Sequence, residues 1–186
     1  MNIILASASP RRRELMKIIT DNFDAVSTDA DETIPDNIPV KDAAAYLADI
    51  KASCASKKFH DSLIIGCDTT VVCDDIILGK PKDKNQCREF INLLSGRTHS
   101  VITGCCLIFN NDVMTFSVET EVTFRNLTNF EIEEYISTDE PYDKAGGYGI
   151  QGKGALLIEK INGDYFNVVG LPVSRLKIEI DKILNK

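Results

Sequence analysis

The sequence predicts an α/β protein. Residues 3–6 form a short apolar run of the kind found in a buried strand, and a turn and the start of a helix follow it. Residues 42–58 have the pattern of an alanine-rich helix, and the apolar run at 63–67 reads as a second buried strand. Two long strands at 98–109 and 114–124 read as an antiparallel hairpin. Helices that alternate with buried strands are typical of layered α/β folds.

Composition restricts the class of protein. The 186 residues, 44% of them hydrophobic, fit a single domain over 1–186 with two lobes and no linker. The net charge of −7 argues against nucleic acid as a partner, because binding to a phosphate backbone needs an extended basic face. No apolar run reaches the length of a membrane span and no signal-like segment is present, so we expect a soluble, cytoplasmic protein without a membrane partner. The six cysteines lack C-x-x-C spacing and are interpreted as reduced core residues.

The first predicted helix carries cations at an end that normally repels them. Ser9 suits the N-cap and Pro10 suits the first helical position. Arginines then occupy positions 11–13, where the positive end of the helix dipole favours acidic side chains. This placement indicates that an anion binds there.

The phase of this helix directs two of the arginines inward. Arg11 and Arg12 flank the apolar face, whereas Arg13 points the opposite way. With backbone N–H groups and serine hydroxyls such as that of Ser7, the two guanidinium groups make a site for a phosphate chain. A solvated basic turn is the alternative. The apolar face is expected to consist of Leu15, Ile18 and Ile19.

Three further charged residues occupy informative positions. Lys51 lies on the apolar face of helix 42–58, where its ammonium group either extends to water or meets an anion. Asp68 follows the strand at 63–67, and ligands of α/β proteins bind at the carboxyl ends of such strands. An Asp that caps a turn is the alternative. Lys80, between a glycine and a proline, is well positioned as a cation, although turn lysines are commonly only solubilising.

Two weaker signals concern an acidic loop and a histidine. The carboxylates in loop 26–33 are able to help hold a divalent metal, although loop acids are commonly just solvated. His99 is one of two histidines and has no evident partner in the sequence, so it is interpreted as structural.

A glycine-rich segment covers residues 143–154. Five of the chain's eleven glycines lie within a stretch of nine residues in this segment. A backbone with so few side chains lets a ligand approach closely. Gly147, Gly152 and Lys153 nearly match the phosphate-binding P-loop, but position 154 is Gly where that motif needs Ser or Thr. Residues 155–161 read as a strand and not as the helix that a P-loop requires. The P-loop interpretation is therefore rejected.

Six motifs are spread over nearly the whole chain. They are S-A-S-P-R-R at 7–12, L-A-x-x-K-A at 47–52, G-C-D-T-T-V-V at 66–72, G-K-P-K at 79–82, L-S-G-R-T-H at 94–99 and D-K-A-G-G-Y-G-I-Q-G at 143–152. Together they resemble the motifs of the Maf family of nucleoside triphosphate pyrophosphatases, in the family's order, which makes the set far more specific than any one motif. The sequence departs from the family pattern at Tyr46, where members often carry arginine.

The resemblance implies a fold and an activity. The fold is ITPase-like (Maf/Ham-type), an elongated mixed sheet flanked by helices with a central cleft between two lobes, and the family is commonly homodimeric. The activity is hydrolysis of a nucleoside triphosphate between its α and β phosphates in a house-cleaning role. The family's functional positions correspond here to Arg11, Arg12, Glu32, Lys51, Asp68, Thr69, Lys80 and Gln151.

The expected chemistry assigns a role to each group. Asp68 accepts a proton from the attacking water, while Lys51 and Lys80 offset the developing negative charge. Glu32 and Asp68 hold a divalent metal, with Mg²⁺ expected and Mn²⁺ or Co²⁺ as alternatives. Ser7, Arg11, Arg12 and Thr69 belong to the substrate-binding set.

Base choice is expected to depend on Gln151. Its amide offers one acceptor and one donor, which match the N–H and carbonyl edge of uracil and thymine, so the expected substrates are dTTP and UTP, with modified pyrimidine nucleotides as an extension. The alternative is that the Gln151 amide only braces the glycine-rich segment through hydrogen bonds to its backbone. Two other functions stay open, a pyrophosphatase for 7-methyl-GTP and a nucleotide-binding regulator of cell division or septum formation.

Overall fold

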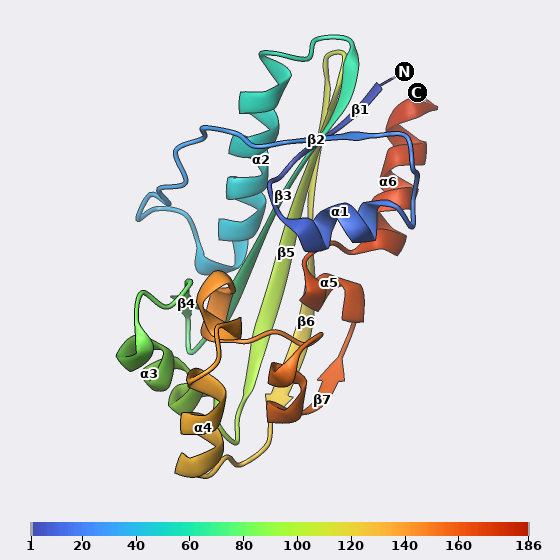
Figure 1. Cartoon of the computed structure of the whole chain (residues 1–186). Coiled ribbons are helices and arrows are strands. Elements are labelled where there is room, and N and C mark those ends of the chain that lie inside the picture. The colour runs from blue at the N-terminus through green and yellow to red at the C-terminus, as the bar shows by residue number, and fades with distance from the viewer. Residues whose placement is uncertain (1, 186) are drawn as a thin grey trace. The chain divides into compact units, whose positions relative to one another are not determined.

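A computed structural model describes residues 2–185, which form a mixed sheet of seven strands flanked by helices (Figure 1). The predicted α/β class is therefore confirmed. The strands are β1 (Asn2–Ala6), β2 (Asp24–Val26), β3 (Ser62–Cys73), β4 (Ile76–Leu78), β5 (Thr98–Phe109), β6 (Asp112–Phe124) and β7 (Ile158–Asn162). The α-helices are α1 (Pro10–Met16), α2 (Ala43–Ser56), α3 (Lys84–Leu94), α4 (Asn129–Ile136), α5 (Tyr165–Val169) and α6 (Val173–Leu184). Short 3-10 helices are η1 (Val40–Asp42), η2 (Glu140–Asp143), η3 (Ala145–Gly147) and η4 (Lys153–Leu157).

The described chain consists of two compact units. Unit 1 contains residues 2–69, 103–118 and 170–185, and unit 2 contains residues 70–102 and 119–169. The prediction of one domain with two lobes and a cleft between them stays a prediction. Among residues 2–185, no helix has the length and apolar character that crossing a membrane requires.

In unit 1, β1 lies between two parallel neighbours. Its pairing with β2 begins at Ile4, which lies opposite Asp24. Its pairing with β3 ends at Ala6, which lies opposite Gly66. The expected end of β3 at residue 67 is wrong, because the strand continues through Asp68 to Cys73. Threonines and valines at 69–72 favour extended backbone, and β4 pairs with the last residues of β3. Asp68 therefore lies within β3, two residues beyond the point where β3 pairs with the carboxyl end of β1.

Helix α2 packs directly against β3 and β5 of the same unit. A Cβ atom added to Gly66 would lie 2.1 Å from the carbonyl oxygen of Ala48, and one added to Gly104 would lie 2.3 Å from backbone atoms of Ala44. Only glycine on the strands permits so close an approach. The packing brings Lys51, on the buried face of α2, next to β3.

Helix α1 is shorter than its apolar pattern suggests. Ser9 is the N-cap, its side chain accepts a hydrogen bond from the Arg12 backbone N–H at 3.4 Å, and Pro10 is the first helical residue, all as predicted. The helix ends at Met16, so the expected inward position of Ile18 is wrong, and that side chain is 60% exposed. Leu15 and Met16 are the buried residues of the helix instead.

In unit 2, side chains cap the N-termini of two helices. Asp83 caps α3 by accepting a hydrogen bond from the Gln86 backbone N–H at 2.8 Å. Thr128 and Glu131 form a capping box at the start of α4. The strand expected at 155–161 is only partly correct, because residues 153–157 form the 3-10 helix η4 and β7 begins at Ile158.

Candidate active site

Arg12 connects three separate segments of unit 1. Its Nε atom donates to the carbonyl oxygen of Gly170 at 2.9 Å, and its Nη2 atom donates to Thr69 Oγ1 at 2.9 Å. Its Nη1 atom donates to Ser7 Oγ at 3.3 Å. The predicted inward direction of Arg12 is confirmed, and Arg13 is exposed as expected.

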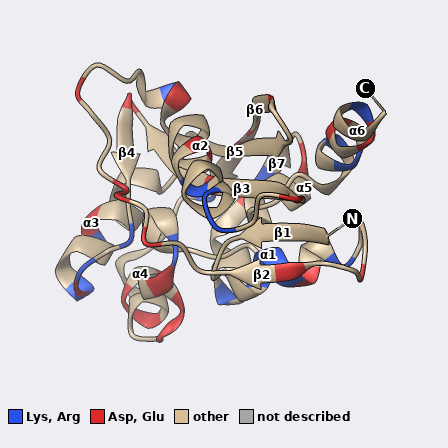
Figure 2. Ribbon diagram, turned by 90° about the horizontal axis from the view of Figure 1, so that it is seen from above, with Lys and Arg blue, Asp and Glu red and all other residues tan. Residues whose placement is uncertain are grey.

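The residues around Arg12 make a polar region at the start of α1. Ser7 is buried, and its hydroxyl also accepts a hydrogen bond from the backbone N–H of Ser9 at 3.3 Å. Thr69 shares a hydrogen bond of 2.9 Å with the Thr103 hydroxyl on β5. Arg11 is half-buried on the same helical turn. Figure 2 shows the basic residues of α1 in blue.

Lys51 is the centre of an ion-pair cluster in unit 1. Its Nζ atom lies 2.5 Å from Asp68 Oδ1 and 3.2 Å from Glu32 Oε1. Lys51 is only 8% exposed, so its ammonium group does not extend to water and the alternative of a solvated lysine is ruled out. Asp68 does not cap a turn, because it lies within β3 and pairs with Lys51. Glu32, from the acidic loop, is 55% exposed at its side chain.

The carboxylates of Glu32 and Asp68 suit a hard divalent cation. Both contribute oxygen donors beside one ammonium group, and Mg²⁺ commonly binds through one or two carboxylates together with substrate phosphates. No group of three or more His, Cys, Asp or Glu residues within 2–185 is arranged to hold a metal by itself. The residues therefore fit a metal that arrives with a phosphate ligand.

Gly170 is a site residue that sequence reasoning missed. The segment around it reads as packing, yet its carbonyl oxygen accepts the Arg12 hydrogen bond. Its φ of +123° is a backbone conformation that side-chain-bearing residues rarely adopt. The signal in the sequence was the glycine itself, directly before the leucine and proline that precede α6.

The cysteines agree with their interpretation as unpaired core residues. All six lie within the described residues and are free, and five are buried while Cys54 is half-buried. Cys67 and Cys105, on β3 and β5, are in contact with their sulfur atoms 3.6 Å apart. The hydrogen bond to Cys67, together with burial, raises the pKa of the Cys105 thiol well above its ordinary value. Both thiols are buried within unit 1.

Lys80 and Gln151 belong to unit 2, and both are exposed. The backbone N–H of Gly146 donates to the carbonyl oxygen of Gly79 at 3.0 Å, so the glycine-rich segment is bonded to the residue next to Lys80. Within residues 2–185, the Gln151 side chain makes no hydrogen bond, and it does not brace the glycine-rich segment.

His99 is structural, as predicted, but it has a partner that the sequence did not reveal. Its Nε2 atom lies 2.6 Å from the hydroxyl of Tyr148, and both rings pack edge-on against Phe124. Burial lowers the pKa of His99 to about 4, so the ring stays neutral. The interaction holds the glycine-rich segment against β5 and β6 of unit 2.

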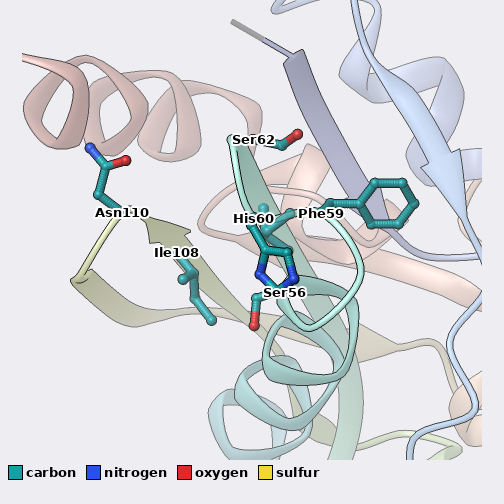
Figure 3. A pocket seen from close by; sticks show the side chains of 7 residues that line it. Ser56, Phe59, His60, Ser62, Ile108 and Asn110 are labelled. Carbon is teal, nitrogen blue, oxygen red and sulfur yellow. The ribbon is translucent and has the colours of Figure 1, made fainter.

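A pocket in unit 1 lies at the start of β3 (Figure 3). Its volume is about 180 Å³, below the roughly 300–1,000 Å³ typical of small-molecule sites. Ser62 lines it and begins β3, and a separation of six residues along a strand corresponds to roughly 20 Å. This pocket is separate from the Lys51 and Arg12 cluster. It is lined by Ser56, Phe59, His60, Ser62, Ile64, Ile108 and Asn110.

Structural comparison supports the predicted fold. The Ham1 protein of Staphylococcus aureus aligns with a TM-score of 0.54 at 13% identity, covering 98% of this chain and 99% of that one. A HAM1 protein from Coxiella burnetii aligns with a TM-score of 0.56 at 12% identity and the same coverage. At such low identity these similarities establish the fold alone.

Sequence comparison establishes the family. The model of the Maf-like protein family matches residues 2–183. A dTTP/UTP pyrophosphatase of Bacillus cytotoxicus is 48% identical over 177 residues, which is 95% of this chain and 93% of that protein. A protein of the same name from Clostridioides difficile is 47% identical over 179 residues, 95% of this chain and 92% of that one. The chain therefore belongs to the Maf family.

Proposed function

We propose that this protein is a nucleoside triphosphate pyrophosphatase that hydrolyses dTTP and UTP to the monophosphate and pyrophosphate in a house-cleaning role. The observation that carries the proposal is the ion pair between buried Lys51 and half-buried Asp68, a cation and a carboxylate held 2.5 Å apart in the same unit as the Arg12 cluster. The similar proteins of Bacillus cytotoxicus and Clostridioides difficile, which are named dTTP/UTP pyrophosphatases, support the choice of substrate.

The triphosphate is bound by the basic start of α1. Arg11 and Arg12 supply guanidinium groups that grip phosphate oxygens in pairs, and the hydroxyls of Ser7 and Thr69 add neutral donors. Arg12 is already oriented by its hydrogen bonds to Thr69 and to the carbonyl oxygen of Gly170. Little side-chain entropy is then lost on binding, which favours affinity.

Asp68 acts as the general base. Its carboxylate accepts a proton from a water molecule, the water oxygen bonds to the α-phosphorus, and the bond from that phosphorus to the bridging oxygen breaks. Pyrophosphate leaves with the negative charge. Lys51 orients Asp68 and offsets charge on the phosphates, and Lys80 adds a second cation for the leaving group.

Glu32 and Asp68 are the residues that would hold a divalent cation, with Mg²⁺ expected and Mn²⁺ or Co²⁺ as alternatives. When bound, such a cation supplies charge stabilisation for the phosphate oxygens. We further expect the enzyme to act in the cytoplasm as a homodimer.

Gln151 selects the base. Its exposed amide offers a carbonyl oxygen to the N3–H of uracil or thymine and an N–H to the neighbouring carbonyl oxygen of the base. Cytosine lacks the N3–H and presents an amine beside it, so the same amide pairs with it less well.

The test is release of pyrophosphate from a panel of dTTP, UTP, dCTP and 7-methyl-GTP in the presence of Mg²⁺. We expect the highest kcat/KM for dTTP and UTP. Tight binding of nucleotides without release of pyrophosphate would support a regulatory protein instead, and preference for 7-methyl-GTP would contradict the choice of base.

A further inference from the structure

Residues 146–154, the part of the glycine-rich segment that contains its five glycines, are attached to their surroundings in unit 2 at both ends. At its start, the Gly146 N–H donates to the carbonyl oxygen of Gly79, and the Tyr148 hydroxyl meets His99. At its end, the attachment is a single carboxylate, that of Glu140 on η2. The residues between these attachments include Gln151.

Glu140 uses both of its carboxylate oxygens. Oε2 accepts a hydrogen bond from the Lys153 backbone N–H at 2.7 Å, and Oε1 accepts one from the Gly154 backbone N–H at 3.0 Å. The Tyr135 hydroxyl donates to Oε1 at 3.3 Å. Burial raises the pKa of Tyr135, so that hydroxyl stays protonated and remains a donor. Three donors thus converge on one carboxylate.

Two glycines of the segment are explained by close contacts with Glu140 and with the neighbouring Lys144. A Cβ atom added to Gly152 would lie 2.3 Å from Glu140 Oε2, and one added to Gly149 would lie 2.6 Å from the Lys144 side chain. Lys144 in turn donates from Nζ to the Glu140 carbonyl oxygen at 2.7 Å. The bare backbone is therefore needed for the approach of Glu140 and Lys144, in addition to any approach by a ligand.

We propose that Glu140 is a positioning residue that holds the glycine-rich segment, and with it Gln151, in the geometry that reads the base. The inference rests on the proposed function. Since the exposed Gln151 side chain makes no hydrogen bond within residues 2–185, its position depends on the backbone that Glu140 anchors. Only an ionised carboxylate presents acceptors on both oxygens, whereas an amide would turn an NH₂ group toward one backbone N–H.

The experiment compares Glu140→Gln with Glu134→Gln, which removes the same charge from an exposed position on α4. Glu140→Gln is expected to raise KM for dTTP about tenfold, with kcat changed less than about threefold, and to reduce the preference for dTTP over dCTP. Inhibition by inorganic tripolyphosphate, which offers phosphates without a base, is expected to stay unchanged. Hydrogen exchange at the Lys153 and Gly154 amides is expected to accelerate, and Glu134→Gln is expected to match the wild type in every measurement.

Several outcomes overturn the inference. An unchanged KM in Glu140→Gln shows that the anchor is irrelevant to base recognition. Equal weakening of dTTP and tripolyphosphate shows a general structural role. If Glu140→Gln does not fold, Glu140→Asp keeps the carboxylate on a shorter side chain, and it must show the same selective rise in KM. A wild type without pyrophosphatase activity refutes the proposed function, whereas an active wild type with an indistinguishable Glu140→Gln refutes the role of Glu140 alone.

Discussion

Lys51 donates a hydrogen bond of 2.5 Å to Asp68 across 17 residues of sequence. Lys51 projects from the buried face of α2, and Asp68 lies on β3 just beyond the end of β1. Glu32 completes the cluster at 3.2 Å from the same ammonium group. The position of Lys51 on an apolar helical face is explained by its ion pair with Asp68. The same ion pair holds the Asp68 carboxylate in one orientation.

Asp68→Asn is expected to lower kcat for dTTP by roughly 10²–10⁴-fold with little change in affinity, because it removes the general base and preserves the shape of the side chain. Steady-state kinetics and binding of a non-hydrolysable dTTP analogue measure the two effects. Asp61→Asn, at an exposed position before β3, is the control and should retain full activity. An Asp68→Asn variant with a rate near that of the wild type would refute the assignment.

Arg12→Ala is expected to lower kcat/KM by about 10- to 100-fold, since hydrogen bonds to charged groups contribute roughly 1.5–3 kcal/mol each. Arg13→Ala, on an exposed position of the same helix, is expected to have little effect. Kinetics with dTTP measure both variants. Equal losses would show that the region around Arg12 is not where the triphosphate binds.

Gly170→Ala is expected to lower kcat/KM about tenfold, because it disturbs the hydrogen bond that orients Arg12. Its φ of +123° disfavours any residue with a Cβ atom, at a cost of roughly 1–3 kcal/mol, and relief of that strain would move the carbonyl oxygen that Arg12 uses. The measurement is a double-mutant cycle with Arg12→Ala, in which the second substitution should add little. Additive losses would show that Gly170 acts independently of Arg12.

Gln151→Glu is expected to abolish the preference for dTTP and UTP over 7-methyl-GTP. A carboxylate supplies two acceptors, which suit the adjacent donors of a guanine edge and repel the carbonyl oxygens of uracil. Hydrolysis rates for the three nucleotides, measured on both proteins, provide the test. A proportional loss on all three would mean that Gln151 does not read the base.

His99 is expected to make folding sensitive to acid. Burial lowers its pKa from 6.5 to about 4 in the folded state, so the unfolded chain takes up the proton first as pH falls. The free energy of unfolding contributed by the neutral ring is complete above pH 6.5 and is lost as pH falls toward about 4, by up to roughly 3 kcal/mol. Urea unfolding of wild type and His99→Gln from pH 7 to 4 checks this, and parallel curves would contradict it.

The sequence by itself determined the local features of this protein. The caps at Ser9, Asp83 and Thr128 follow from side chains that bond to backbone groups three residues away. The turn at 74–75 uses aspartates, which tolerate the positive φ observed there. The chemical character of the site was also evident, because charges on apolar faces and near strand ends need a specific explanation.

The tertiary structure decided which of those residues meet. Arg12 bonds to Gly170 across 158 residues and Lys51 to Asp68 across 17, and nothing in a local pattern specifies such pairs. Pairing with β4 carries β3 beyond Asp68, which the residue pattern around the aspartate did not indicate. Burial of a polar group requires a partner, and only the packing of segments distant in sequence determines which partner that is.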